Sequence, residues 1–331
     1  MSPPKVGLPL KWPESSVLVT GGTGSFGNKF VEIMLAKYHP RRLVIFSRDE
    51  LKQSEMMTRF KDPSLRFFVG DVRDRDRLER AMHGVDLVVH AAALKQIPSC
   101  EYNPFEAILT NVMGAKNVID AAIDQGVKRV VALSTDKACQ PTNLYGATKL
   151  CAEKLFVQAN VYGHPRGTVF SVVRYGNVIG SRGSVIPLFA AQRPAGRVTV
   201  TDPGMTRFWI RLDQGVEFVV HCASATRGGE IFVPKIPSMR MMDLVEAVAP
   251  GCHVEFIGIR PGEKLHELLM SEDESRQAVE LDEMFAIEPI EPSWPFPAAA
   301  SGKRPPPGFR YASDSNGSWL SLDAMRELID G

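Results

Sequence analysis

The sequence predicts an α/β protein with a doubly wound parallel sheet and a smaller, mixed C-terminal part. Short apolar runs alternate with helical patterns up to about residue 174. A glycine-rich turn directly follows the first apolar run. After residue 175 the alternation ends, and glycine and proline turn signals become frequent. We therefore expect a larger N-terminal domain over 1–175 and mainly a substrate-binding part over 176–331, some of whose segments return to the first core.

The first strand is expected over residues 16–20, an apolar run of the kind found in buried parallel strands. It leads into Gly21, Gly24 and Gly27, which have the spacing GxxGxxG. Glycines at these positions permit a tight turn, let the backbone approach a pyrophosphate, and bring the next helix, expected over 28–37, close to the sheet. The amides at the start of that helix can then face a phosphate.

A glycine pattern alone is a weak signal, but here it stands between a strand and a helix at the start of an alternating series. This context predicts a Rossmann-type dinucleotide-binding domain. The residues of the turn assigned to the cofactor are Gly21, Thr23, Gly24, Ser25, Phe26 and Gly27.

The tip of the second strand, expected over 43–46, indicates which dinucleotide is bound. An NAD site usually has an acid here that bonds the ribose 2′-hydroxyl, whereas Ser47 and Arg48 suit a 2′-phosphate. Lys52 adds positive charge, although Asp49 could still serve NAD. The sequence therefore favours NADP over NAD. The segment assigned to the cofactor comprises Ser47, Arg48, Asp49, Glu50, Leu51 and Lys52.

The third and fourth strands, expected over 66–70 and 86–90, also end in residues suited to a cofactor. The third leads to Asp71 and Val72, and Asp71 is placed to bond the adenine amino group. The fourth runs into small residues from Ala91 onward, which let the backbone lie against the cofactor. Lys95 follows and can reach phosphate or sugar. His90, on an apolar strand, is interpreted as structural.

The fifth strand, expected over 129–133, delivers Ser134-Thr135-Asp136-Lys137 to the carboxyl edge of the sheet, where active sites of open α/β sheets lie. Tyr145 and Lys149 follow with helical spacing, so the ammonium can lower the pKa of the phenol. A phenolate beside a nicotinamide can take an alcohol proton while the hydride leaves. Asp136 and Lys137 supply further proton transfers, although a solvated charge pair is the alternative reading. These are more acid–base residues than a plain alcohol dehydrogenase needs.

Composition limits the remaining possibilities. The formal net charge of +1 over 331 residues gives no argument for nucleic acid or an acidic membrane surface. No apolar run is long enough to span a bilayer, and the first residues lack the hydrophobic region of a signal peptide. Five cysteines without a CxxC pair argue against a disulfide framework or zinc site and fit a reducing cytosol. We expect a cytoplasmic protein without a metal.

Late in the chain, the stretch 289–307 is rich in proline, alanine, serine and glycine and is interpreted as a flexible loop. Order is expected to return near Trp319, and Ser321 is a candidate cap for a last helix.

These motifs together resemble the extended short-chain dehydrogenase/reductase family. More narrowly, they resemble the inverting UDP-N-acetylglucosamine 4,6-dehydratases that begin pseudaminic acid synthesis in bacteria. Where dehydratases acting on TDP-glucose carry Thr-Asp-Glu, this chain has Thr135-Asp136-Lys137. Tyr145 stands where the membrane-bound retaining dehydratases and the related epimerases typically carry Met. The matching stretches are 20–27, 47–53, 70–74, 91–95, 134–137, 145–150, 173–185, 206–210, 230–239 and 259–267.

The resemblance implies a mechanism. Tyr145, supported by Lys149, removes the proton of the sugar 4-hydroxyl while C4 gives a hydride to NADP⁺, and Thr135 bonds the 4-oxygen. Lys137, if neutral, takes the C5 proton, and Asp136, if protonated, gives one to the departing 6-hydroxyl. The hydride returns to C6 and C5 is reprotonated on the opposite face. The product would be UDP-2-acetamido-2,6-dideoxy-β-L-arabino-hex-4-ulose.

The resemblance also implies contacts and assembly. Val178 would lie against the cofactor. The chain is expected to form a closed homo-oligomer, of which a hexamer is one form, although the sequence does not fix the number. Gln96 and Cys139 depart from the residues common in the family. The residues expected to hold the UDP-sugar are Lys95, Asn177, Arg182, Gly183, Ser184, Val185, Arg260 and Glu263.

Two other functions stay open at this point. A nucleotide-sugar epimerase would use Tyr145 and the cofactor without eliminating water, and the pair Asp136-Lys137 argues against it. A catalytically silent NADP-sensing scaffold would not need the intact set of acid–base residues.

Overall fold

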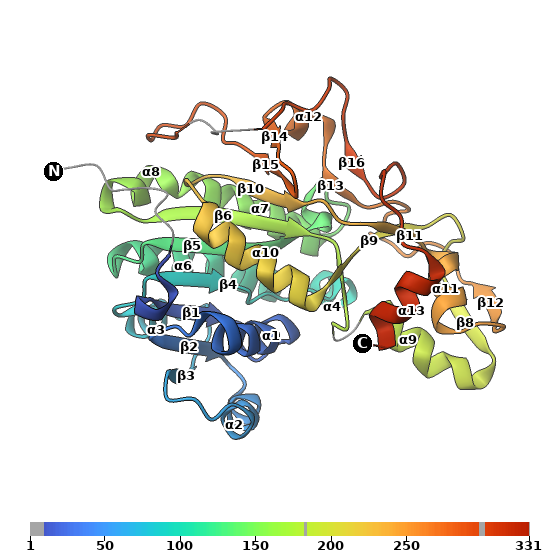
Figure 1. The fold of residues 1–331 in the computed structure, drawn as a ribbon, viewed down its shortest axis with the longest axis horizontal. Coiled ribbons are helices and arrows are strands. Elements are labelled where there is room, and N and C mark those ends of the chain that lie inside the picture. Colours follow the sequence, from blue (N-terminus) through green and yellow to red (C-terminus); the bar gives the residue numbers. More distant parts are fainter. Residues whose placement is uncertain (1–9, 182–183, 298–301, 331) are drawn as a thin grey trace.

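The computed structural model describes residues 10–181, 184–297 and 302–330. Its centre is a nine-stranded sheet with the order β14-β15-β10-β6-β5-β4-β1-β2-β3 (Figure 1). The strands from β3 to β10 are parallel, and β15 pairs antiparallel with both β10 and β14. The order 3-2-1-4-5-6 within this sheet confirms the predicted Rossmann-type doubly wound fold. The strands are β1 (Ser16–Thr20), β2 (Arg42–Ser47), β3 (Leu65–Val69), β4 (Leu87–His90), β5 (Arg129–Thr135), β6 (Val169–Tyr175), β10 (Ile231–Pro234), β14 (Ala278–Glu280) and β15 (Met284–Ile287).

Helices cover both faces of this sheet, as a buried parallel sheet requires. Helices α1 (Ser25–Ile33) and α10 (Leu212–Ala225) pack together on one face, and α3, α6 and α7 pack on the other (Figure 1). The helix after the glycine turn differs from the prediction, because α1 ends at Ile33 and continues as the π-helical segment η2 (Met34–Tyr38). The other helices of this part are α2 (Glu50–Arg59), α3 (Arg75–Met82), α4 (Ile97–Tyr102), α5 (Pro104–Ile108), η3 (Leu109–Met113), α6 (Gly114–Asp124), η4 (Asp136–Ala138), α7 (Leu144–Gln158) and α8 (Asn160–Gly163).

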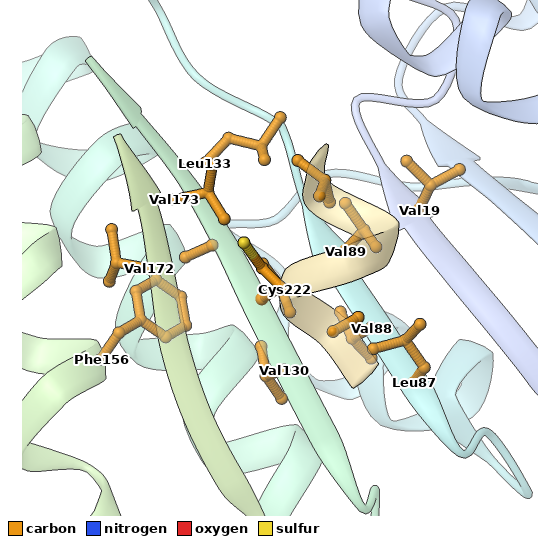
Figure 2. Close-up of a cluster of buried hydrophobic side chains, with 14 of the residues drawn as sticks. Val19, Leu87, Val88, Val89, Val130, Leu133, Phe156, Val172, Val173 and Cys222 are labelled. Atoms are coloured by element: carbon orange, nitrogen blue, oxygen red, sulfur yellow. The ribbon is translucent and has the colours of Figure 1, made fainter. Parts of the chain in front are cut away.

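The main core consists of branched aliphatic side chains from the central strands. All five residues of β1 and all seven of β5 are buried. Figure 2 shows Cys222 of α10 directed toward this layer, among Val88, Val89 and Val130. This packing fixes the strand ends, from which the site described below projects. His90 is also buried and bonds Thr20 Oγ1 through Nδ1 at 2.8 Å, in agreement with a structural role.

A second, smaller core lies in the C-terminal part, around Trp209, Phe189 and Leu244. Among its described residues this part contains three small sheets. By contrast, β10, β14 and β15 belong to the large sheet, and α10 helps to cover that sheet. The division into 1–175 and 176–331 stays a prediction. The remaining elements are β7 (Asn177–Ile179), α9 (Val185–Gln192), β8 (Arg197–Val200), β9 (Thr206–Arg211), β11 (Ser238–Arg240), α11 (Met241–Val248), β12 (His253–Phe256), β13 (Leu268–Met270), α12 (Glu272–Ser275), β16 (Tyr311–Ala312) and α13 (Leu322–Asp330).

The late segments are packed more firmly than their composition suggests. Trp294, within the proline-rich stretch, is buried, and its Nε1 donates to Gly228 O at 3.2 Å. Ser321 Oγ accepts from Ala324 N at 3.1 Å, which confirms the predicted cap of α13. None of the helices within the described ranges combines the length and the apolar character needed to cross a membrane.

Candidate active site

The glycine turn lies at the topological switch point, between β1 and the neighbouring end of β4. Gly21 has a φ of +65°, and a Cβ on it would lie 2.9 Å from the backbone of Ala92. A Cβ on Gly27 would lie 2.2 Å from Gly22 O, so α1 can approach the turn only because Gly27 lacks a side chain. The open end of α1, with Gly24 at its N-cap, therefore faces a cradle of backbone that fits a pyrophosphate.

A cavity of ≈ 770 Å³ begins at this turn and follows the carboxyl edge of the sheet. Most of the predicted cofactor residues line it. Gly27, Glu50 and Leu51 are outside the lining, Gly27 because it packs against Gly22. The predicted cofactor residues in the lining are Gly21, Thr23, Gly24, Ser25, Phe26, Ser47, Arg48, Asp49, Lys52, Asp71, Val72, Ala91, Lys95, Tyr145, Lys149 and Val178.

At the β2 end of this cavity the charged side chains are partly exposed. Arg48 lies 3.6 Å from Asp71 Oδ2, and the Arg48 side chain is 53% exposed. Asp49 caps α2 by accepting from Lys52 N at 3.0 Å, and its carboxylate is also paired with the Lys52 ammonium. Ser47 Oγ accepts from Gln53 Nε2 at 3.0 Å. Asp49, the acid that the sequence offered to an NAD ribose, is thus engaged by the helix cap and by Lys52.

Asp136 and Lys137 lie at the opposite end, where β5 passes into the single turn η4. Asp136 is fully buried, and its Oδ1 accepts from Thr135 Oγ1 and from Lys137 Nζ, both at 2.9 Å. Asp136 Oδ2 has no hydrogen-bond partner among the described residues. Lys137 lines the cavity, whereas Asp136 stands behind it.

Electrostatics favour the ammonium form of Lys137. Burial acts to lower the pKa of Lys137, but the neighbouring carboxylates Asp136 and Glu267 outweigh it, so the pKa is raised. The neutral amine that the resemblance implied is therefore not the resting form of this side chain.

Tyr145 and Lys149 project from the first two turns of α7, which approach η4 closely. Asn143 caps this helix by accepting from Gly146 N at 2.8 Å. A Cβ on Gly146 would lie 2.2 Å from Lys137 O, so only glycine lets the helix come this near to the Asp136–Lys137 turn. Tyr145 and Lys149 both line the cavity.

The expected effect of Lys149 on the phenol needs correction. Burial raises the pKa of Tyr145 to about 12, and the largest opposing influences are the Lys137 charge and a hydrogen bond with Thr135. Lys149 Nζ instead donates to Leu133 O at 2.6 Å, and burial lowers the pKa of Lys149 to about 8. Lys137 is therefore the cation that acts on the phenol, although the effect of burial is larger. The helix repeat by itself does not fix which ammonium lies nearest to the Tyr145 phenol.

A second cavity of ≈ 530 Å³ adjoins the first at Lys137 and extends into the C-terminal part. Of the predicted substrate residues, Lys95 lines the first cavity, Val185 lines the second, and four line both. Arg182 and Gly183 lie outside the described residues. The four residues shared by the cavities are Asn177, Ser184, Arg260 and Glu263.

Sequence reasoning missed two charged residues of this second cavity. Glu267 lies 3.4 Å from Lys137 Nζ, and Arg207 lies 3.7 Å from Glu267. Both side chains are buried. They fall within the stretches 206–210 and 259–267 that carry the family resemblance, so the signal was present, but their separation from Lys137 along the chain concealed the contact.

Comparison with known proteins shows the family to which this chain belongs. The family described as polysaccharide biosynthesis protein matches residues 17–289. The UDP-N-acetylglucosamine 4,6-dehydratase (inverting) of Campylobacter jejuni is 49% identical over 96% of this chain and 98% of its own length. The UDP-glucose 4-epimerase of Rickettsia conorii is 44% identical and covers 83% of each chain.

Two solved structures agree with the fold. Pen from Bacillus thuringiensis matches with a TM-score of 0.87 and 40% identity, over 97% of this chain and 98% of Pen. DesIV from Streptomyces venezuelae, a dTDP-glucose 4,6-dehydratase solved with NAD and TYD bound, matches with a TM-score of 0.67 and 25% identity, over 76% of this chain and 86% of DesIV.

Proposed function

We infer that this chain, which belongs to the polysaccharide biosynthesis protein family, is a UDP-N-acetylglucosamine 4,6-dehydratase that inverts C5. The observation that carries this conclusion is the pair formed by the buried Asp136 and the partly exposed Lys137, which stands at the carboxyl end of β5 beside Tyr145. A hydro-lyase acting on a sugar needs a base for the C5 proton and an acid for the departing 6-hydroxyl, and this pair can supply both.

One proton shift would prepare both groups. Lys137 Nζ donates to Asp136 Oδ1 at 2.9 Å. Transfer of that proton along the hydrogen bond converts the ion pair into a neutral amine and a carboxylic acid. Lys137 can then take the C5 proton as the C5=C6 bond forms, while Asp136 protonates the leaving 6-oxygen and water departs. Because Asp136 is buried, the neutral pair costs less here than it would in water.

Tyr145 is the residue proposed to take the proton of the sugar 4-hydroxyl, with Thr135 orienting the oxygen. The Lys137 charge and the Thr135 hydrogen bond both favour the phenolate, against the burial that raises its pKa. When bound, a nicotinamide dinucleotide would supply the hydride chemistry, by accepting a hydride from C4 and returning it to C6. The glycine cradle at Gly21 and Gly24 would hold its pyrophosphate.

The alternative function is that of an epimerase, and the relative from Rickettsia conorii, named a UDP-glucose 4-epimerase, is the observation that favours it. Simple 4-epimerisation needs no acid at O6, whereas Asp136 is held in position by two hydrogen bonds. The greater coverage and identity of the Campylobacter relative also favour the dehydratase.

We further propose NADP as the preferred cofactor. The exposed guanidinium of Arg48 and the Lys52 ammonium would meet a ribose 2′-phosphate, while the Asp49 carboxylate caps α2 and pairs with Lys52. Equilibrium binding of NADP and NAD to the purified chain tests this, and tighter binding of NAD would overturn it.

Three further proposals rest on the family resemblance and on composition. The product would enter pseudaminic acid type nucleotide-sugar synthesis, and the chain would act as a closed homo-oligomer, with a hexamer as the form to test. The five free cysteines support a reducing, cytoplasmic location. Light scattering of the purified protein measures the oligomer directly.

NMR of the protein with UDP-N-acetylglucosamine in heavy water tests the central proposal. We expect a new 6-methyl signal, a hydrated 4-ketone, deuterium at C5 and L-arabino couplings. A D-xylo product would keep the dehydratase but contradict inversion. An epimer without a methyl signal would establish the alternative function.

A further inference from the structure

Glu267 is a buried residue whose carboxylate contacts Lys137 of the proton-transfer pair. Its Oε1 lies 3.4 Å from Lys137 Nζ and 3.7 Å from Arg207 Nε. Its side chain is only 2% exposed, and its Oε2 has no hydrogen-bond partner within the described part of the chain. Glu267 also lines the second cavity together with Lys137. Burying a carboxylate is costly unless cations compensate its charge, and Lys137 and Arg207 are the cations that do so here.

Three distant segments hold Glu267 in this place. Glu267 N donates to Ser313 Oγ at 2.9 Å, and Ser313 N donates to Glu267 O at 2.9 Å. Ser313 Oγ in turn bonds Thr206 Oγ1 at 2.7 Å, next to Arg207 on β9. The Arg207 guanidinium is itself fixed by donation to Thr206 O at 2.8 Å and Lys264 O at 3.0 Å. The position of Glu267 is therefore set by β9, the start of β13 and the end of β16.

We propose that Glu267 is a positioning residue: its carboxylate, shared between Lys137 and Arg207, holds the Lys137 amine at the cavity and sets the balance between its charged and neutral forms. This role extends the proposed dehydratase function and rests on that function only for its catalytic consequence. The balance matters because the C5 proton can be taken only by the neutral amine.

The charges facing Lys137 come from several elements. Asp136 and Glu267 stabilise its ammonium, whereas Arg207 opposes it. Lys95 also lies within electrostatic range, and so does the Tyr145 phenol. Asp136 is proposed to accept the Lys137 proton, and Arg207 is held by backbone carbonyls. Glu267 is therefore the carboxylate that compensates the Lys137 ammonium when the substrate approaches.

Replacing Glu267 by glutamine removes the charge and keeps the size. We expect the pH at which Lys137 is half-deprotonated to fall by about one unit, because an opposite charge a few ångströms away favours the charged form. Competitive labelling of the holoenzyme with acetic anhydride, read by peptide mass spectrometry, measures this for Lys137 without any turnover. Glu267→Asp, which keeps the charge, should titrate close to wild type, and Arg207→Met should move the midpoint upward.

Glu230→Gln is the matched control, because Glu230 is also buried and paired with an arginine, Arg227, but lies away from the cavity. It should leave the Lys137 midpoint unchanged even if it lowers the Tm. An unchanged midpoint in Glu267→Gln would overturn the proposal, whatever happens to Tm. Should Arg207→Met fail to fold, the comparison of Glu267→Gln with Glu267→Asp still decides.

The catalytic consequence has a separate readout. With UDP-N-acetylglucosamine, the rising limb of kcat against pH should move down with the labelling midpoint in Glu267→Gln, and KM should change less than kcat. Coincident pH profiles for wild type and Glu267→Gln would contradict the role. If wild type forms no dehydrated product, the proposed function fails, while the labelling result still tests Glu267.

Discussion

The two ends of the main cavity hold their charges in opposite ways. At the β2 end, Arg48 is 53% exposed and Lys52 is 43% exposed, and both are paired with neighbouring carboxylates near the surface. At the β5 end, Asp136 and Glu267 are 1% and 2% exposed, and Lys137 lies between them. Exposed ion pairs contribute little to stability, and the charge state of one hardly affects another. The charge state of a buried group, in contrast, depends on all the charges around it.

The contrast indicates a division of labour. The β2 end has to admit and release a charged ligand, so solvated cations and backbone amides are sufficient there. The β5 end has to move protons, which requires groups whose charge state responds to nearby charges. We therefore expect substitutions at the β5 end to change rate and pH dependence, and substitutions at the β2 end to change affinity.

The largest effect should follow from Lys137→Met. Loss of the base should lower kcat by roughly 10⁴-fold, the upper range for general acid–base catalysis. The 6-methyl NMR signal measures this, with Lys128→Met as control, because Lys128 is exposed and pairs with Asp86 at the surface. A fall in Lys137→Met no greater than in Lys128→Met would remove Lys137 from the mechanism.

Lys149→Met should reveal the effect of burying the Lys149 amine on the pH dependence of stability. The pKa of Lys149 is about 8 in the folded chain, below its ordinary value of 10.5, so the unfolded chain binds more protons between these limits. From this group alone, stability should rise as pH increases from about 8 to 10.5, by up to about 3 kcal/mol. The wild type minus Lys149→Met difference in unfolding free energy should therefore climb over that window, and a flat difference would contradict the assignment.

Gly27→Ala tests the backbone contribution of the glycine turn. The added Cβ would lie 2.2 Å from Gly22 O, so we expect a loss of about 1–3 kcal/mol in stability and weaker NADP binding. Gly215→Ala is the control, since Gly215 is also helical but its Cβ would be 3.9 Å from the nearest atom. Denaturant unfolding and cofactor titration separate the two variants, and equal stabilities would show that the turn tolerates a side chain.

Arg48→Ala should give the smallest change, confined to affinity. Losing a charge-assisted contact should weaken NADP binding by about tenfold and leave NAD binding nearly unchanged. Fluorescence titration with both cofactors measures this, and stability should stay within about 0.5 kcal/mol of wild type because the Arg48–Asp71 pair is exposed. Equal losses for both cofactors would mean that Arg48 does not read the 2′-phosphate.

Much of the fold and of the cofactor end could be predicted because the signals there are local. The glycines, the strand 16–20 and the helix that follows are contiguous, and the parallel order places each strand end at one edge of the sheet. The same reasoning brought Asp136, Lys137 and Tyr145 together, because β5 and α7 are neighbours in sequence. The end of α1 was less predictable, since a change to π-helical hydrogen bonding at Met34 leaves no mark on the apolar periodicity.

By itself, then, the sequence determined the strand–glycine–helix turn and the doubly wound class of the sheet, and it named the candidate acid–base residues, because each depends on residues close along the chain. Only the tertiary structure decided the charge environment of those residues. Glu267 and Arg207 reach Lys137 through β9, β13 and β16, and Lys149 turns to Leu133 O rather than to the phenol. Burial and long-range contacts set a pKa, and neither is written in local spacing.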